Sequence, residues 1–344
     1  MVSRKKKLLL VMSIVGLLLV ISTTGLFAAG AQEATSTEQK SMTLRLAHIS
    51  DEGHPSHKAS MLFKELVEEK TDGVVKVEVY SNSSLGSAPE YTEQLQLGAL
   101  ELGLVTSGQL QVWVPEYGAV MIPFLFEGYE HAHRALDGEA GELLADYAAE
   151  QGFVVIGNWE WGFRQLSNRL LKVEKPADVA RLKMRVPNEI QLESMYKALG
   201  ATTSIISFPE LYMALAQGVV DGQCNPLSTI YYQKLYEVQP FVTILNHVYN
   251  TQMLVASEKA WNSLTEETKQ IVLDASAQAG ALARELTVNS EEELIQKLEE
   301  ADVTVNYPDL APFRDKMGPA IKTIGDFAGN EFTDKFVKLV EQAR

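Results

Sequence analysis

Strands and helices alternate in the hydrophobic pattern that follows residue 43. TLRLAHIS at 43–50 alternates apolar and polar positions as a strand does, and the next segment has a helical apolar face between Leu62 and Val67 and ends at Gly73. VVKVEVYS is typical of a second strand, Glu90 to Leu100 of a helix, and LELGLV of a short buried strand. This order predicts an α/β fold whose N-terminal third is βαβαβ with mainly parallel strands.

Two helices in the middle of the chain have predicted start and stop signals. NEIQLESMYKALG is opened by Asn188 with Gln191, and SFPELYMALAQG is opened by Ser207 with Glu210. Each segment ends in a glycine, the residue that most often follows the last turn of a helix.

Two more strands are predicted in the middle of the chain, one that begins at Phe153 and one over LKMRV at 182–186.

The C-terminal third contains a long helical stretch. From Ser263 to about Ala301 the chain then has no proline, and apolar residues recur at spacings of three and four. Since ordinary globular helices average about 11 to 12 residues, this stretch predicts one very long helix or two abutting ones.

Residues 1–31 have the pattern of an export signal. The basic run RKKK precedes 14 largely apolar residues from Leu8 to Ile21, and small residues stand at 28–31. A membrane-spanning helix needs about 20 apolar residues, so the run predicts a signal peptide cleaved near Ala31. The mature protein is then expected in the periplasm, with the polar residues 32–42 as a flexible lead-in.

The net charge of −15 disfavours nucleic acid and anionic membrane as partners, because the far field would repel phosphates. The four basic residues of RKKK are the only charges of residues 1–31, so their removal makes the chain more acidic still. The single cysteine, Cys224, excludes an intrachain disulfide and lies far from the cleavage region, so no lipid is expected on a new N-terminus.

Several strings resemble the solute-binding proteins of tripartite ATP-independent periplasmic (TRAP) transporters, the DctP family. They are WGFRQLSNR (161–169), LKMRVPN (182–188) and SFPELYMALAQGVVDGQCNP (207–226), followed by KLYEVQPFV. HISDEGHPSHKA, LGLVTS and IPFLF also fit, so the resemblance covers nearly all of the chain after the signal. It implies a receptor that captures mostly organic acids and hands them to a membrane permease driven by an ion gradient.

The resemblance also implies a two-lobed, periplasmic-binding-protein-like α/β fold with a long helix spanning both lobes. Residues 43–161 and 250–289 are expected to form lobe I, and residues 162–249 and 290–344 lobe II. The lobes are expected to close over the ligand as a hinge. We expect a monomer that needs no cofactor.

Matched motif by motif, the resemblance implies six ligand-binding residues. The family's principal carboxylate-binding arginine falls on Arg185 and a supporting arginine on Arg164. The asparagine of the Q-x-N-P stretch falls on Asn225, a ring that lines the cleft on Phe208, and two more variable ligand-facing positions on His48 and Thr106.

The chemistry of these residue types agrees with such roles. Arginine stays charged and offers a planar fork of donors that fits a carboxylate, which lysine does not. Structural alternatives remain: the stem of Arg185 could pack while its head pairs with an acid, and Arg164 could pair with Glu160. Asn225 could be a turn residue before a proline, and Phe208 could belong to the core.

Aromatic and acidic residues near 160 are further candidates. Trp159 and Trp161 lie two apart on a predicted strand, hence on one side of it, and could stack on the apolar face of a sugar ring. More often such tryptophans belong to the core. Glu160 between them could accept hydrogen bonds from ligand hydroxyls.

A metal site and a catalytic site are both disfavoured. His48, Asp51, Glu52, His54 and His57 are close in sequence, but their spacings match no compact zinc motif. No base matches Cys224 as a nucleophile, and a lone cysteine is most often a small buried hydrophobe. Glycine-rich phosphate loops and the G-x-S-x-G elbow are absent from the sequence.

Three function classes follow. The preferred one is a receptor for TRAP transport, and the second is a receptor of the same fold that serves a sensor. The third is an exported hydrolase or lyase for acidic sugars that uses Glu160, His48 and the two arginines.

The expected ligand is a sugar acid, either a hexuronate or an aldonate. Two arginines together with many polar groups favour it over sialic acid or a C4-dicarboxylate.

Overall fold

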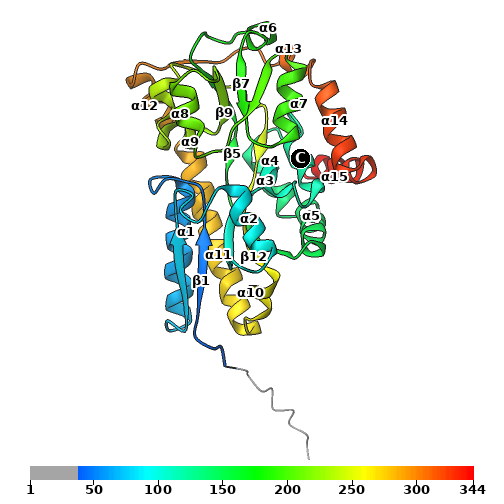
Figure 1. Cartoon of the computed structure of the whole chain (residues 1–344). Coiled ribbons are helices and arrows are strands. Elements are labelled where there is room, and N and C mark those ends of the chain that lie inside the picture. The colour runs from blue at the N-terminus through cyan, green and yellow to red at the C-terminus, as the bar shows by residue number, and fades with distance from the viewer. Residues whose placement is uncertain (1–37) are drawn as a thin grey trace, which may run out of the picture. The chain divides into compact units, whose positions relative to one another are not determined.

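The computed structural model describes residues 38–344. The predicted signal peptide at 1–31 and its cleavage near Ala31 lie outside these residues, as does the first half of the lead-in. The described residues build two large β-sheets with helices packed on them (Figure 1). None of the helices within 38–344 is long and apolar enough to cross a membrane.

The first sheet has five strands in the order β2-β1-β3-β12-β4. Their bounds are β1 (Met42–Ala47), β2 (Val75–Tyr80), β3 (Leu102–Thr106), β4 (Phe153–Asn158) and β12 (Gln252–Ser257). Strand β1 is parallel to β2 and β3, whereas β12 is antiparallel to β3 and β4. The helices α1 (Pro55–Lys70) and α2 (Ala88–Gln96) make the crossovers between the parallel strands. The predicted βαβαβ unit is therefore confirmed.

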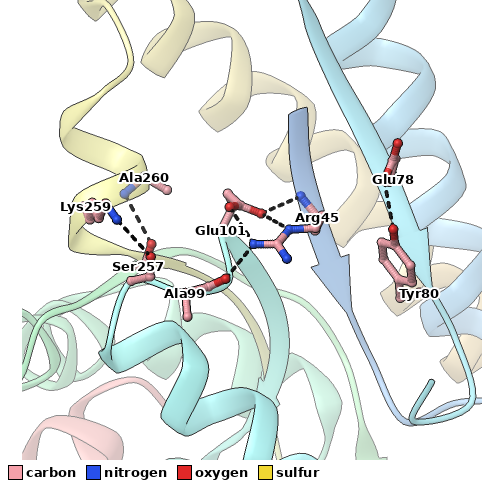
Figure 2. Close-up of polar contacts among 9 residues, drawn as sticks. Arg45, Glu78, Tyr80, Ala99, Glu101, Ser257, Lys259 and Ala260 are labelled. Carbon is pink, nitrogen blue, oxygen red and sulfur yellow. Dashed lines mark hydrogen bonds and ion pairs between the residues drawn. The ribbon is translucent and has the colours of Figure 1, made fainter. Parts of the chain in front are cut away.

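An ion pair fixes the register of β1 against β3 (Figure 2). Arg45 Nε donates to Glu101 Oε2 at 2.8 Å, and Arg45 Nη2 donates to Glu101 Oε1 at 2.9 Å and to the Ala99 carbonyl at 2.5 Å. On the neighbouring strand, Tyr80 Oη donates to Glu78 Oε2 at 2.8 Å. Glu101 directly precedes β3, so the bidentate pair links β1 to the start of β3, where Ala47 lies opposite Gly103 and Thr106 extends three residues further.

The second sheet has six strands in the order β13-β10-β6-β9-β7-β8. Their bounds are β6 (Gln165–Asn168), β7 (Lys183–Val186), β8 (Thr202–Ile205), β9 (Gly222–Asn225), β10 (Phe241–Thr243) and β13 (Thr304–Asn306). Strand β7 is parallel to β8 and β9, and β6 is antiparallel to β9 and β10. A separate two-stranded ladder of β5 (Gly162–Phe163) and β11 (Tyr249–Asn250) lies where the chain passes between the sheets.

Shorter elements complete the middle of the chain. The helices are α3 (Ser107–Leu110), α4 (Tyr129–Leu136), α5 (Glu139–Glu150), α6 (Pro176–Val179), α7 (Ile190–Ala198), α8 (Leu211–Ala216) and α9 (Leu227–Tyr232). Two 3-10 helices are η1 (Pro115–Met121) and η2 (Leu235–Val238).

The predicted capping signals of two helices are wrong in detail. Helix α7 begins at Ile190, and no side chain caps it; Gln191 Nε2 instead donates to Gln111 Oε1 at 2.8 Å. Helix α8 begins only at Leu211, and the predicted contact between the Ser207 hydroxyl and the Glu210 carboxylate forms in the turn before the helix. For α7 the local signal is outweighed by a contact that forms only in the folded chain, whereas for α8 the predicted pair forms without starting the helix.

The long helical stretch is two abutting helices, one of the two predicted alternatives. Helix α11 (Glu266–Asn289) lies alongside α1, and after Ser290 the helix α12 (Glu291–Glu300) packs on α9 and β13 (Figure 1). The pair thus connects elements of both sheets. The remaining helices are α10 (Glu258–Asn262), α13 (Ala311–Arg314), α14 (Gly318–Ala328), which packs on α7 and η1, and α15 (Asn330–Gln342), which packs on α4 and α5.

Candidate functional site

A cavity of about 340 Å³ opens where carboxyl ends of parallel strands from both sheets face each other. Small-molecule sites usually measure about 300 to 1,000 Å³, and α/β sheets bind ligands beyond the carboxyl ends of their strands. Segments around both sheets line the cavity. On the side of the first sheet the lining residues are those of α2 together with Ile49, Thr106, Gly108, Gln109, Val112, Trp113 and Trp161. On the side of the second sheet they are Arg164, Arg185, Pro187, Asn188, Glu189, Ile205, Ile206, Ser207, Phe208 and Asn225.

Arg185 lies on β7, between β8 and β9, and only 3% of its surface is exposed. Its Nε donates to the Ile206 carbonyl at 2.8 Å, so the neighbouring strand's end holds the guanidinium in place. Burial, and then the positive charge of Arg164, lower the pKa of Arg185 to about 10. Two buried cations that repel each other favour an anion between or beside them.

Arg164 stands between β5 and β6 and is equally buried. Its backbone N–H donates to the Val248 carbonyl at 2.9 Å. Its side chain is tied to Cys224, with Nε 3.3 Å from Sγ and Nη2 donating to the carbonyl oxygen. Cys224 thereby has a positioning role, and the alternative ion pair of Arg164 with Glu160 is absent among residues 38–344.

Four more predicted residues line the same cavity. Asn225 is the last residue of β9. Its Nδ2 donates to Gln223 Oε1 at 2.6 Å, so the side-chain oxygen Oδ1 is left to accept from other donors. Thr106 ends β3, and Phe208 follows β8. Trp161 packs on the His54 ring with a centroid distance of 5.2 Å. The structure therefore brings together Arg185, Arg164, Asn225, Phe208, Thr106 and Trp161.

Trp159 lies outside the lining of the cavity. It packs edge-on against Phe63 in the core of the first sheet, and its Nε1 donates to Ser276 Oγ at 3.1 Å. The prediction that Trp159 and Trp161 share a side is wrong, because β4 ends at Asn158 and the two-residue alternation of a strand no longer applies.

Glu160 and His48 also lie outside the lining. Glu160 is fully buried, and its Oε2 lies 2.5 Å from His133 Nε2 on α4. His48 Nδ1 accepts from the Ser50 N–H at 3.2 Å, while its Nε2 lies 3.2 Å from His57 Nδ1. Both side chains thus bond to protein groups that do not line the cavity.

Glu189 is a cavity residue that was not predicted from the sequence. It is 5% exposed and lines the same cavity as the two arginines. Burial raises the pKa of the Glu189 carboxyl, and the positive charges of Arg164 and Arg185 oppose that rise. Its position three residues after the carboxyl end of the Arg185 strand was a usable signal.

No group of three or more His, Cys, Asp or Glu side chains in the described part of the chain is arranged to hold a metal ion. The three nearby histidines serve other contacts instead. His54 Nδ1 caps α1 by accepting from the Ser56 N–H, and His48 pairs with His57.

Comparison with known families decides the class of the protein. The family model described as bacterial extracellular solute-binding protein, family 7 (DctP), matches residues 46–326. The chain belongs to the DctP family of TRAP periplasmic solute-binding proteins. Its relatives include the sialic acid-binding periplasmic protein SiaP of Vibrio cholerae, 30% identical over 89% of this chain and 95% of SiaP.

Solved structures of this family share the fold. DctPAm of Advenella mimigardefordensis, a sugar acid binding protein in complex with galactonate, matches with a TM-score of 0.86 and 31% identity, covering 89% of this chain and all of that one. A TRAP solute-binding protein of Sulfitobacter sp. NAS-14.1 with bound β-D-galacturonate matches with 0.84 and 30%, over 88% and 100%. One of Sulfurospirillum deleyianum with bound succinate matches with 0.82 and 30%, over the same shares. The predicted two-lobed α/β fold is confirmed, and the family is one of receptors, not enzymes.

Proposed function

We propose that this TRAP solute-binding protein captures a sugar acid, a hexuronate or an aldonate, and delivers it to a TRAP-type membrane permease. The observation that carries the proposal is the pair of buried guanidinium groups, Arg164 and Arg185, in one cavity. Guanidinium binds carboxylate through two parallel hydrogen bonds, and burial protects that pair from screening by salt.

Further groups favour a ligand with hydroxyls. Asn225, Thr106 and Glu189 add side-chain amide, hydroxyl and carboxylate oxygens to the lining, and Phe208, Trp113 and Trp161 add aromatic faces. The hydroxyls of a polyhydroxylated acid can donate to these oxygens, and the apolar face of its ring can pack on these aromatic side chains. Related proteins with bound galactonate and galacturonate support this class, while the succinate-bound one keeps a C4-dicarboxylate as the competing outcome.

Binding is proposed to occur by hinge closure of two lobes. The proposed lobes are residues 43–161 with 250–289 and residues 162–249 with 290–344, except that α15 packs on the first lobe's α4 and α5. Since the cavity wall comes from both sheets, moving one sheet against the other would open or enclose the ligand.

A thermal-shift screen against an organic-acid library tests the ligand class on protein lacking residues 1–31. A ligand at 100 times its dissociation constant stabilises the folded state by about 2.7 kcal/mol. Hexuronates and aldonates are expected to raise the melting temperature most. A screen in which sialic acid or C4-dicarboxylates alone raise it would replace the sugar-acid assignment. Uptake by cells that carry the permease subunits, lost when this protein is omitted, tests transport against a sensing role.

A further inference from the structure

Glu189 places a third charged group in the cavity, opposite in sign to the two arginines. It precedes helix α7, and its backbone N–H donates to the Pro187 carbonyl at 2.7 Å, which fixes the turn after β7. Arg185 and Glu189 therefore belong to one short segment that ends in the cavity wall.

The carboxylate of Glu189 has hydrogen-bonding capacity to spare. Within residues 38–344, its Oε2 is buried and has no hydrogen-bond partner. No ion pair within 4.0 Å joins it to Arg164 or Arg185 in this part of the chain, although all three line the same cavity. Because an unpaired buried carboxylate is unfavourable, an occupant of the cavity that donates hydrogen bonds would be favoured there.

The opposite wall of the cavity is shaped around this carboxylate. Gly108, on α3 of the first sheet, faces it so closely that a Cβ at position 108 would lie 2.6 Å from both carboxylate oxygens. Any other residue at position 108 would push the carboxylate away. The position of the Glu189 side chain thus depends on elements from both sheets.

We propose that Glu189 is the residue that makes this site select a hydroxylated monocarboxylate and reject a dicarboxylate. Its oxygens accept hydrogen bonds from ligand hydroxyls, and its negative charge repels a second ligand carboxylate. The inference rests on the proposed sugar-acid function and names the side chain that enforces it.

The charge balance of the cavity agrees with this role. Two arginines and one glutamate leave a single net positive charge in the buried part, which one ligand carboxylate neutralises. At the mouth, the exposed Glu90 and Glu93 add negative charge, and Glu90 Oε2 is held in place by the Ser87 N–H and hydroxyl at 2.7 Å each. A dianion would meet acidic groups both on entry and inside.

The test measures dissociation constants for D-galacturonate and succinate by calorimetry on wild type and variants. In Glu189→Gln, which keeps the shape and removes the charge, galacturonate affinity is expected to fall 10- to 100-fold while succinate binding stays or strengthens. Glu189→Asp keeps the charge but shortens its reach, so it is expected to weaken galacturonate and still reject succinate. Glu150→Gln removes the same charge from an exposed position on α5 and is the matched control.

The outcomes separate the two proposals. Galacturonate binding by wild type with an unchanged preference in Glu189→Gln would overturn the role of Glu189 and leave the sugar-acid function intact. Tight succinate binding by wild type, without galacturonate binding, would overturn both. If the unfolding transition shows that Glu189→Gln does not fold, the affinities of Glu189→Asp and Gly108→Ala for galacturonate and succinate test the role of Glu189 instead. The latter is expected to weaken galacturonate at least tenfold because it displaces the carboxylate.

Discussion

Arg185 and Ile206 are joined by a hydrogen bond of 2.8 Å, from the guanidinium Nε to the backbone carbonyl that follows β8. The bond uses only the Nε of the guanidinium. Within residues 38–344, neither terminal nitrogen of Arg185, Nη1 or Nη2, has a hydrogen-bond acceptor. One side chain is thus held by the sheet and still presents two parallel donors. A lysine has a single nitrogen and cannot do both.

Replacing Arg185 by alanine is therefore expected to abolish measurable sugar-acid binding while the protein still folds. Leaving a buried carboxylate without its partner costs about 2 to 5 kcal/mol, or about 30-fold to several thousand-fold in affinity. Arg185→Lys is the conservative comparison and is expected to lose at least tenfold. Calorimetry gives the affinity and thermal unfolding the fold; near-wild-type binding by the alanine variant would remove Arg185 from the site.

Arg164→Ala is expected to weaken binding less than Arg185→Ala. Two of the Arg164 nitrogens already contact Cys224, so fewer of its donors are available to a ligand. The same calorimetric titration of both variants ranks the two residues. A larger loss at Arg164 would exchange the principal and supporting roles.

Three buried histidines predict a loss of stability in acid. Burial lowers the pKa of His48, His54 and His247 to about 3, against 6.5 for an exposed histidine. Below pH 6.5 these histidines become protonated in the unfolded chain, whereas in the native chain they stay neutral until about pH 3. The free energy of unfolding therefore falls as the pH falls through this window. Between pH 7.5 and 5.0 each histidine is expected to remove about 2 kcal/mol from the free energy of unfolding.

The variant His54→Asn isolates one of these contributions. Asparagine keeps an acceptor for the Ser56 N–H at the start of α1 but does not titrate. Urea unfolding at both pH values is expected to show a smaller acid loss in the variant, by about 2 kcal/mol. An equal loss in variant and wild type would mean that His54 does not carry this pH dependence.

Much of the fold followed from local patterns. The βαβαβ unit from Met42 to Thr106 could be predicted because strand alternation, helix faces and the parallel crossover rule all agree there. Arg185, Arg164 and Asn225 were placed together by motif resemblance, and they line one cavity.

Tertiary contacts explain what the sequence did not reveal. The two tryptophans at 159 and 161 separate because the chain leaves β4 after Asn158, which no residue in the segment signals. The position of Glu189 three residues after β7 could have placed it near the cavity, but its close approach to Gly108 on α3, 81 positions away in sequence, could not be predicted. Gln191, expected to cap α7, reaches Gln111 instead.

Ligand binding is expected to draw the two proposed lobes together. Small-angle scattering of the protein with and without D-galacturonate should give a smaller radius of gyration for the bound form. An unchanged radius at saturating ligand would contradict closure on binding.

The central claim is that the site accepts an acid with hydroxyls, and a matched calorimetric comparison of D-galacturonate, D-galactose and succinate tests it most directly. Galactose leaves both guanidinium groups without an anion, and succinate leaves the acceptors of Glu189 and Asn225 without hydroxyl donors. We predict that galacturonate binds at least about 100-fold more tightly than either, since each unpaired buried polar group costs about 1 to 3 kcal/mol. Tight binding of succinate with none of galacturonate would contradict the sugar-acid assignment, and binding of galactose alone would contradict the anion site itself.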